Sequence, residues 1–193
     1  MRAIAALAFG GLMLAGAAHT HAEDGNRDAG RQVAGQCRTC HGLDGYARIP
    51  IAPHIGGEPA NYLAAQLQAF KSGARQHEIM SIVSAGLSDR QISDVAAWYA
   101  SYSASAELPA GVDATMAPEA CVACHGANGI SILEDAPNLA GETNIYIDTQ
   151  LKAFRLGKRT HEIMSEIAAG LSDAEIRAVA DWYAAAKLTI TPP

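Results

Sequence analysis

The sequence predicts an all-α protein made of two tandem domains, and three observations support this prediction. First, the second half repeats the first at a constant offset of 84 positions, without a gap from the first cysteine to the last helix. Second, apolar residues recur at helical spacing near the end of each copy. Third, no alternating run of β-branched residues indicates a strand. The repeat is too long for a solenoid unit, so we interpret it as two whole domains.

Helices are expected at equivalent places in the two copies. Residues 28–36 can form a helix that leads into the first cysteine pair, and residues 62–72 form another, which Gly73 is placed to end. The last helix of each copy begins with a capping-box pattern, at Ser88 and at Ser172. These helices define the predicted all-α class.

The two copies differ in the segment that joins them. Residues 102–118 break the helical pattern and are expected to form a linker. Pro118 stands only three residues before Cys121, and proline disfavours a continuous helix at that point. The opening helix of the second copy is therefore expected to be short or distorted. The predicted boundaries are residues 1–22 for a cleaved signal peptide, 23–105 for the first domain and 106–193 for the second.

Each copy contains one Cys-x-x-Cys-His pentapeptide, and all the cysteines of the chain belong to these two motifs. This pattern is typical of the attachment of c-type haem: two thiols add to the haem vinyl groups, and the histidine becomes the proximal iron ligand. The sequence therefore predicts two covalently bound haem c groups. The predicted attachment residues are Cys37, Cys40, Cys121 and Cys124, and the predicted proximal ligands are His41 and His125.

Zinc binding and thiol redox chemistry are the alternatives for paired cysteines. Structural zinc modules bring their cysteine pairs closer together in sequence, and here each pair is followed by histidine. A thioredoxin-like motif would follow a strand, and none is expected. Covalent haem is the favoured interpretation.

The sixth iron ligand is predicted from residues that recur in both copies. Met80 and Met164 are repeat partners, whereas Met116 corresponds to a glutamine. A thioether ligand favours reduced iron and raises the potential relative to a second imidazole. His77 and His161 lie three residues earlier and are the competing ligands. We predict methionine at both sites.

Other repeated residues have candidate roles around the haems. A carbonyl at Pro53 or Pro137 could accept the second N–H of the proximal imidazole, although an ordinary turn proline fits equally well. Trp98 and Trp182 are expected in the core, and His54 is expected to face solvent. Three repeated pairs could contact haem propionates, but surface or packing roles fit each of them better: Tyr62 and Tyr146, Gln66 and Gln150, and Arg75 and Arg159.

The N-terminal segment and the net charge restrict the expected location and partners of the protein. Arg2 precedes an uncharged apolar run that ends near Ala22, which predicts a secretory signal peptide cut after Ala22 and a periplasmic protein without stable membrane insertion. Peripheral membrane association stays open. The net charge is −6. Residues 106–193 carry six basic against twelve acidic residues, and residues 23–105 carry seven against eight. The acidic second half argues against nucleic acid and permits docking on a basic partner.

The combination of motifs resembles cytochrome c4-type proteins, which are dihaem class I cytochromes c. The resemblance rests on the tandem haem motifs, on Ala-Pro-x-Ile/Leu-x-Gly-Glu, on Phe-Lys/Arg-x-Gly-x-Arg, and on Met-Ser followed by Ala-Gly-Leu-Ser-Asp and a Trp-Tyr helix. It implies two class I cytochrome c domains related by pseudo-twofold symmetry, each wrapped around one covalently attached haem. It also implies His/Met ligation of both irons and electron delivery toward terminal oxidases.

The expected function is electron relay rather than catalysis. The expected partners are a quinol-oxidising complex or a dehydrogenase as donor and a terminal oxidase as acceptor. One alternative is a cytochrome subunit of a flavin-dependent sulfide- or alcohol-oxidising dehydrogenase. A dihaem peroxidase is the other, and it would need an iron with an open or displaceable site.

Overall fold

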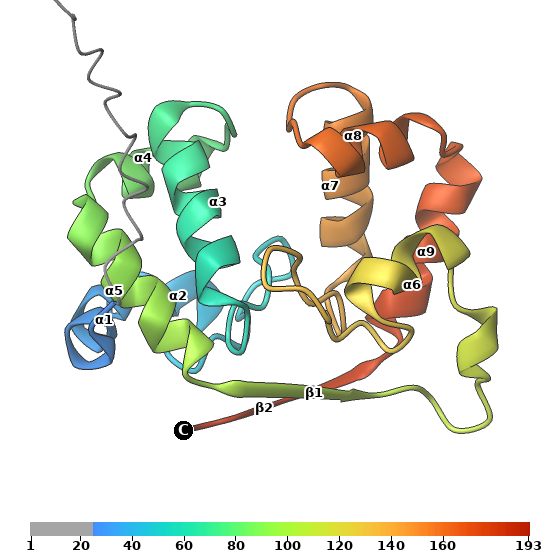
Figure 1. Cartoon of the computed structure of the whole chain (residues 1–193), viewed down its shortest axis with the longest axis horizontal. Coiled ribbons are helices and arrows are strands. Elements are labelled where there is room, and N and C mark those ends of the chain that lie inside the picture. Colours follow the sequence, from blue (N-terminus) through green and yellow to red (C-terminus); the bar gives the residue numbers. More distant parts are fainter. Residues whose placement is uncertain (1–24) are drawn as a thin grey trace, which may run out of the picture.

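The computed structural model describes residues 25–193 of the 193-residue chain. The predicted signal peptide, residues 1–22 with cleavage after Ala22, lies outside the described residues. Figure 1 shows two helical halves side by side, with a ribbon of two strands running beneath both of them. The predicted all-α class is confirmed, because helices account for nearly all the regular structure of the described part.

The two halves repeat the same order of helices after their first elements. The first half contains α1 (Arg27–Ala34), α2 (Arg38–His41), α3 (Ala60–Ser72), α4 (Glu78–Ala85) and α5 (Asp89–Ala100). The second half contains the 3₁₀ helix η1 (Ala114–Met116), then α6 (Glu119–His125), α7 (Asn144–Arg155), α8 (Glu162–Ala169) and α9 (Asp173–Ala184).

The predicted helix ends are confirmed. Gly73 ends α3 in the left-handed conformation, with φ of 80°. Ser88 and Ser172 each close a full capping box, with Gln91 and Glu175 respectively, so the first backbone N–H groups of α5 and α9 have acceptors. These caps set where the last helix of each half begins.

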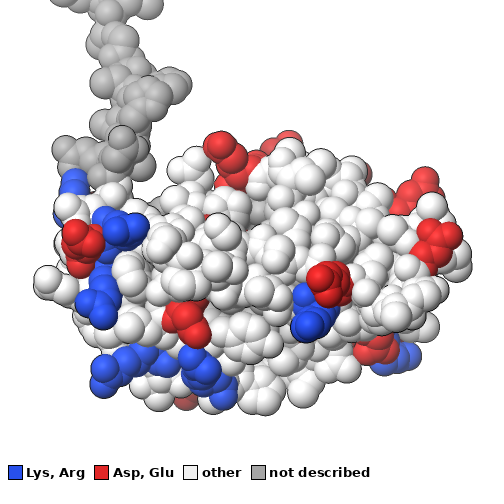
Figure 2. All heavy atoms as spheres, turned by 90° about the horizontal axis from the view of Figure 1, so that it is seen from below, with Lys and Arg blue, Asp and Glu red and all other residues white. Residues whose placement is uncertain are grey.

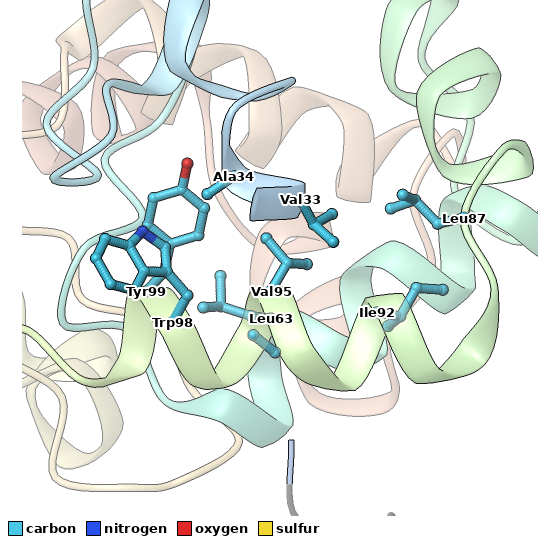
Figure 3. Packing of buried hydrophobic residues seen from close by; sticks show 9 residues of the cluster. Val33, Ala34, Leu63, Leu87, Ile92, Val95, Trp98 and Tyr99 are labelled. Carbon is cyan, nitrogen blue, oxygen red and sulfur yellow. The ribbon is translucent and has the colours of Figure 1, made fainter. Parts of the chain in front are cut away.

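Each half has its own hydrophobic core, built on its last helix. In the first half, Ile92, Val95 and Tyr99 of α5 pack with Val33 of α1 and Leu63 of α3 (Figure 3). In the second half, α9 supplies Ile176, Val179, Ala180 and Tyr183, which pack with Ile147 and Leu151 of α7. The two separate clusters are consistent with the predicted division into residues 23–105 and 106–193, which itself stays a prediction.

The opening helix of the second half is reduced, as predicted. In the first half α1 crosses α5 so closely that a Cβ at Gly30 would lie 1.9 Å from the carbonyl oxygen of Asp94. The equivalent of Gly30 in the repeat is Ala114, which already carries a Cβ and lies in η1. Pro118 then occupies the N-cap of α6, where its missing N–H costs little.

Two short strands contradict the expectation that the chain has none. Strand β1 (Ser103–Glu107) pairs antiparallel with β2 (Lys187–Thr191), with Ala104 opposite Ile190. The expectation was wrong for two reasons. Strand β1 consists mainly of serine and alanine, so its alternation carries almost no hydrophobic contrast. Strand β2 does alternate, in Leu188-Thr189-Ile190-Thr191, and this short run was overlooked. One face of the ribbon is half-buried against glycine turns: a Cβ at Gly57 would lie 2.6 Å from the Ala104 side chain. The ribbon connects the end of each half to the other half.

Candidate haem sites

Each pentapeptide lies on a short helix that brings its side chains together. Cys37 caps α2 and Cys40 and His41 lie within it, while the equivalent residues of the second half all lie in α6. All four cysteines are half-buried and free of disulfides. Among residues 25–193, no three Cys, His, Asp or Glu side chains are grouped as ligands for one ion. The zinc alternative therefore has no ligand set in the described part.

Both motif histidines are oriented by the carbonyl of a proline. Nδ1 of His41 lies 2.9 Å from the carbonyl oxygen of Pro53, and Nδ1 of His125 lies 2.8 Å from that of Pro137. A carbonyl only accepts, so each Nδ1 carries the proton and each Nε2 keeps its lone pair for a metal. Of the two roles that the sequence leaves open for these prolines, the structure thus shows the carbonyl acceptor in both halves.

Burial sets the protonation state of these side chains. It lowers the pKa of His41 and His125, although the bonds to the proline carbonyls oppose the shift, so both imidazoles are held neutral, as iron ligation requires. Burial also raises the pKa of the Cys37 and Cys121 thiols. A raised thiol pKa disfavours the thiolate that disulfide-exchange chemistry needs, which argues against a thioredoxin-like role.

The last helix of each half holds the loop that follows the motif. The Tyr99 hydroxyl donates to the carbonyl of Gly42 at 3.0 Å, and the Trp98 indole N–H donates to that of Leu43 at 3.0 Å. Tyr183 and Trp182 make the equivalent bonds to Gly126 and Ala127. The helical spacing predicts the tryptophans in the core, but it cannot predict the tyrosine hydroxyl bonds, because apolar spacing on a helix says nothing about a hydroxyl.

The structure places the two candidate sixth ligands at the same position of equivalent helices. Met80 and Met164 lie in the first turn of α4 and α8, and both are half-buried. Their competitors have another role: Nδ1 of His77 accepts the backbone N–H of Met80, and Nδ1 of His161 accepts that of Met164, each at 3.3 Å. These capping bonds favour methionine as the ligand, and that assignment stays a prediction.

The repeated arginines, glutamines and tyrosines form one cluster between the halves. Arg75 and Arg159 face each other in an isolated antiparallel bridge. The Oε1 atom of Gln66 accepts from both guanidinium groups, at 2.7 and 2.9 Å, and that of Gln150 does the same at the same distances. Arg159 also donates to Tyr62 at 3.2 Å, and Arg75 donates to Tyr146 at 3.4 Å. The interface therefore holds two buried positive charges on neutral acceptors.

Replacing Gln66 with leucine should destabilise the holoprotein by about 2 kcal/mol or more, because two buried guanidinium N–H groups lose their acceptor. Gln68 lies on the same helix but is exposed, where it donates to Asp89. The variant Gln68→Leu is therefore the matched control and should change the free energy of unfolding by no more than about 0.5 kcal/mol. Denaturant unfolding of both variants measures this; equal, small effects would show that the cluster does not stabilise the fold.

A second contact between the halves consists of two reciprocal hydrogen bonds, each accepted by a buried carboxyl group. Oε1 of Glu142 accepts the backbone N–H of His54 at 2.8 Å, and Oε2 of Glu58 accepts that of Asn138 at 2.9 Å. The His54 ring lies 3.0 Å from the carbonyl oxygen of Gly141. His54 is only 8% exposed, so the expectation that it faces solvent is wrong. It was missed because its partners lie almost 90 residues away in sequence.

Burial raises the pKa of Glu58 to about 8, although the bond from Asn138 opposes this shift. Between the ordinary value of 4.5 and about 8, the native state binds more protons than the unfolded chain. The free energy of unfolding should therefore fall as pH rises through this window, by up to about 1.4 kcal/mol per pH unit for one carboxyl. Denaturant titrations at several pH values test this. The slope should shrink in Glu58→Gln and persist in the exposed control Glu134→Gln; an identical slope in both would contradict it.

The chain is similar to cytochromes in sequence. The family model described as cytochrome c matches residues 114–185. A protein named thiosulfate dehydrogenase electron acceptor, from Stutzerimonas stutzeri, is 37% identical over 168 residues, which are 77% of each chain. A cytochrome c4 from Pseudomonas aeruginosa is 32% identical over 188 residues, covering 89% of this chain and 92% of the relative.

Solved structures give the same picture. The reduced recombinant cytochrome c4 of Pseudomonas stutzeri matches with a TM-score of 0.72 at 29% identity, over 84% of this chain and 100% of that one. The thiosulfate dehydrogenase TsdBA of Marichromatium purpuratum matches with a TM-score of 0.70 at 31% identity, over 83% of this chain. The present chain spans only 40% of the length of that dehydrogenase.

Proposed function

The chain belongs to the cytochrome c4 family of dihaem cytochromes c, and from that premise we propose that it is a periplasmic carrier of electrons between membrane-bound or periplasmic redox enzymes. Membership implies two covalently bound haem c groups and two tandem cytochrome c domains related by pseudo-twofold symmetry. No helix within residues 25–193 has the length and hydropathy of a bilayer-spanning segment.

The proposed ligand set uses the residues that recur in both halves. In the first half, Cys37 and Cys40 hold the haem by thioether bonds, and His41 and Met80 ligate its iron. In the second half, Cys121 and Cys124 hold the haem, and His125 and Met164 are the ligands. The observation that carries this proposal is the pair of short bonds from the proximal imidazoles to Pro53 and Pro137.

The bound haem supplies one-electron chemistry, and the protein sets the surroundings. The proline carbonyls fix each imidazole with Nε2 free, and the tyrosine and tryptophan bonds hold the loop behind each motif. The histidine caps start α4 and α8 next to the methionines. Since these elements are fixed by packing, little rearrangement should accompany a change of charge. In this proposal the protein itself catalyses no substrate turnover.

The proposed donors are a quinol-oxidising complex or a dehydrogenase, and the proposed acceptor is a terminal oxidase. The distribution of charge supports docking in a preferred orientation. On the face shown in Figure 2, lysine and arginine side chains gather mainly over the first half. Across the chain, residues 106–193 carry six more acidic than basic residues, and residues 23–105 carry one more. Such asymmetry can steer two halves toward different partners, and salt weakens it.

A second candidate is a dedicated electron acceptor of one dehydrogenase. Sequence similarity favours thiosulfate dehydrogenase in particular, because relatives named as its electron acceptor are 37% and 34% identical to this chain. In this role the protein would take electrons released by the oxidation of thiosulfate, instead of serving several donors.

Stopped-flow kinetics separate the two candidates. The oxidised holoprotein is mixed with a purified thiosulfate dehydrogenase and thiosulfate, and separately with membranes that oxidise quinol. A general carrier should be reduced by both and then reoxidised by membranes that contain a terminal oxidase. A dedicated acceptor should be reduced rapidly only by the dehydrogenase and should co-purify with it on gel filtration. Rapid turnover of peroxide by the purified holoprotein would overturn both candidates.

A further inference from the structure

The feature that carries a further inference is the crossed pair of carboxyl groups between the halves. Glu58 and Glu142 are 4% and 3% exposed, and each belongs to one copy of the same repeated segment. Each accepts a backbone N–H from the other half, from Asn138 and His54 respectively. The two contacts are equivalent under the repeat, so the arrangement is a property of the whole interface.

These N–H groups belong to the same peptide bonds that hold the proximal histidines. The Pro53–His54 peptide accepts a hydrogen bond from His41 at its oxygen and donates one to Glu142 at its nitrogen. The Pro137–Asn138 peptide accepts from His125 and donates to Glu58. A single peptide group therefore separates each proximal imidazole from a buried carboxyl of the opposite half.

We infer that Glu58 and Glu142 form a proton-binding site that couples the two haem sites crosswise, so that the carboxyl of one half tunes the reduction potential of the haem in the other. This inference rests on the proposed ligation by His41 and His125. An ionised carboxylate polarises the peptide, strengthens the bond from the imidazole and stabilises ferric iron. Protonation removes that effect and raises the potential.

The surroundings of the two carboxyl groups favour their protonated form. Oε2 of Glu142 is buried and has no hydrogen-bonding partner among the described residues. Burial raises the pKa of both carboxyls, and Glu58 raises that of Glu142 further. The groups that oppose this shift on the pair are the two backbone N–H donors. The titratable and charged neighbours are the His54 ring and Tyr146, with His41 and Asp44 beyond the ring and Tyr62, Arg75 and Arg159 beyond the tyrosine.

In the proposed coupled step, the protein takes up one electron at one iron and up to one proton at the carboxyl pair. The electron comes from the reduced donor and reduces one iron from ferric to ferrous. The proton comes from water and binds a carboxylate oxygen of the pair, so the buried interface gains no net charge. On reoxidation both leave. By linkage, the potential must then fall as pH rises across the titration of the pair.

The test is a redox titration of the wild-type holoprotein from about pH 5 to pH 9, repeated on Glu58→Gln, Glu142→Gln and the exposed control Glu134→Gln. Haem methyl resonances, assigned to each half with the help of a Met80→His variant, report each iron separately. In wild type, the equilibrium constant for reduction of each haem should fall by about tenfold in total as pH rises, which lowers the potential by about 59 mV for a one-electron couple.

The variants give the crossed signature. Glu142→Gln should flatten the pH profile of the first haem. Glu58→Gln should flatten the profile of the second haem, and it should move the profile of the first haem to lower pH because Glu142 loses its repulsive neighbour. Glu134→Gln should match wild type. Propionate titration would be common to all four proteins, so it does not mimic this pattern.

Redox-difference infrared spectra give a second readout. It is recorded first on the wild type, so it does not depend on the stability of the variants. Wild type should show a protonated carboxyl band that appears on reduction and is weaker in each glutamine variant. Unchanged profiles in both variants, or an effect of each variant on the haem of its own half alone, would overturn the inference. Two reversible couples whose pH profiles lack the crossed pattern would overturn the inference and leave the proposed carrier function intact, whereas failure to find two reversible couples would count against that function itself.

Discussion

Replacing Met164 with histidine should lower one of the two reduction potentials by on the order of 0.1 V or more, within the span of about 0.8 V that axial ligands cover. The thioether favours ferrous iron, whereas a second imidazole donates more strongly and stabilises ferric iron. The substitution should also remove half of the iron–sulfur absorption band of the oxidised protein. Met80→His should act equally on the other couple.

The chain supplies a matched control for these substitutions. Met116 is 73% exposed and has no methionine partner in the repeat. Met116→Ala should therefore leave both potentials and the absorption band unchanged. If His161→Asn shifted a potential while Met164→His did not, the histidine that caps α8 would be the ligand, and the assignment of methionine would be wrong.

Replacing Gly30 with alanine should destabilise the first half by about 3 kcal/mol or more. The new Cβ would lie 1.9 Å from the Asp94 carbonyl oxygen and 3.0 Å from the Trp98 Cβ, so α1 and α5 would have to separate. The gain in helix propensity, about 1 kcal/mol, is too small to offset this overlap. Trp98 would move with its helix, and its hydrogen bond to the loop after the first motif would weaken.

Gly86→Ala is the control, since a Cβ there meets only the Val83 carbonyl oxygen, at 3.5 Å. Its free energy of unfolding should stay within about 0.5 kcal/mol of wild type. Denaturant unfolding followed by far-ultraviolet circular dichroism measures both variants, and the absorption spectrum reports the haem of the first half. Equal stability of the two variants would contradict the tight crossing of α1 and α5.

Much of this molecule could be predicted because the chain repeats itself. The offset of 84 positions pairs Cys37 with Cys121 and Met80 with Met164, so each candidate residue is supported twice. Caps such as Ser88 and Gly73 are local signals, and the structure confirms both. The chemistry of a metal-bound histidine suggested a carbonyl acceptor at Pro53 and Pro137, but only the structure decides between that role and an ordinary turn proline.

The features that sequence reasoning missed are contacts between the halves. Glu58 had no assigned contact, because its partner Asn138 lies 80 residues away in sequence. His54 is buried for the same reason. The strand β1 consists mainly of small residues and becomes visible only when β2 pairs with it. Such contacts depend on how the two halves dock, and no local pattern encodes that.

The arginine cluster illustrates the same limit. For Arg75 and Arg159 the sequence favours a surface or packing role over propionate contacts, and the structure packs them against each other with two glutamines between them. Each arginine also stacks on a phenylalanine of its own half, with Arg75 lying 4.5 Å from the Phe70 ring centre. The interface is thus held by residues whose side chains would be exposed in a single domain.

Coulometric titration of the purified holoprotein, followed by absorption, is the most direct measurement of the central claim that each half holds one haem between a histidine and a methionine. We predict the uptake of two electrons per polypeptide in one-electron steps, with loss of the iron–sulfur band in proportion to each step. Uptake of fewer than two electrons, or an oxidised spectrum without that band, would contradict the claim.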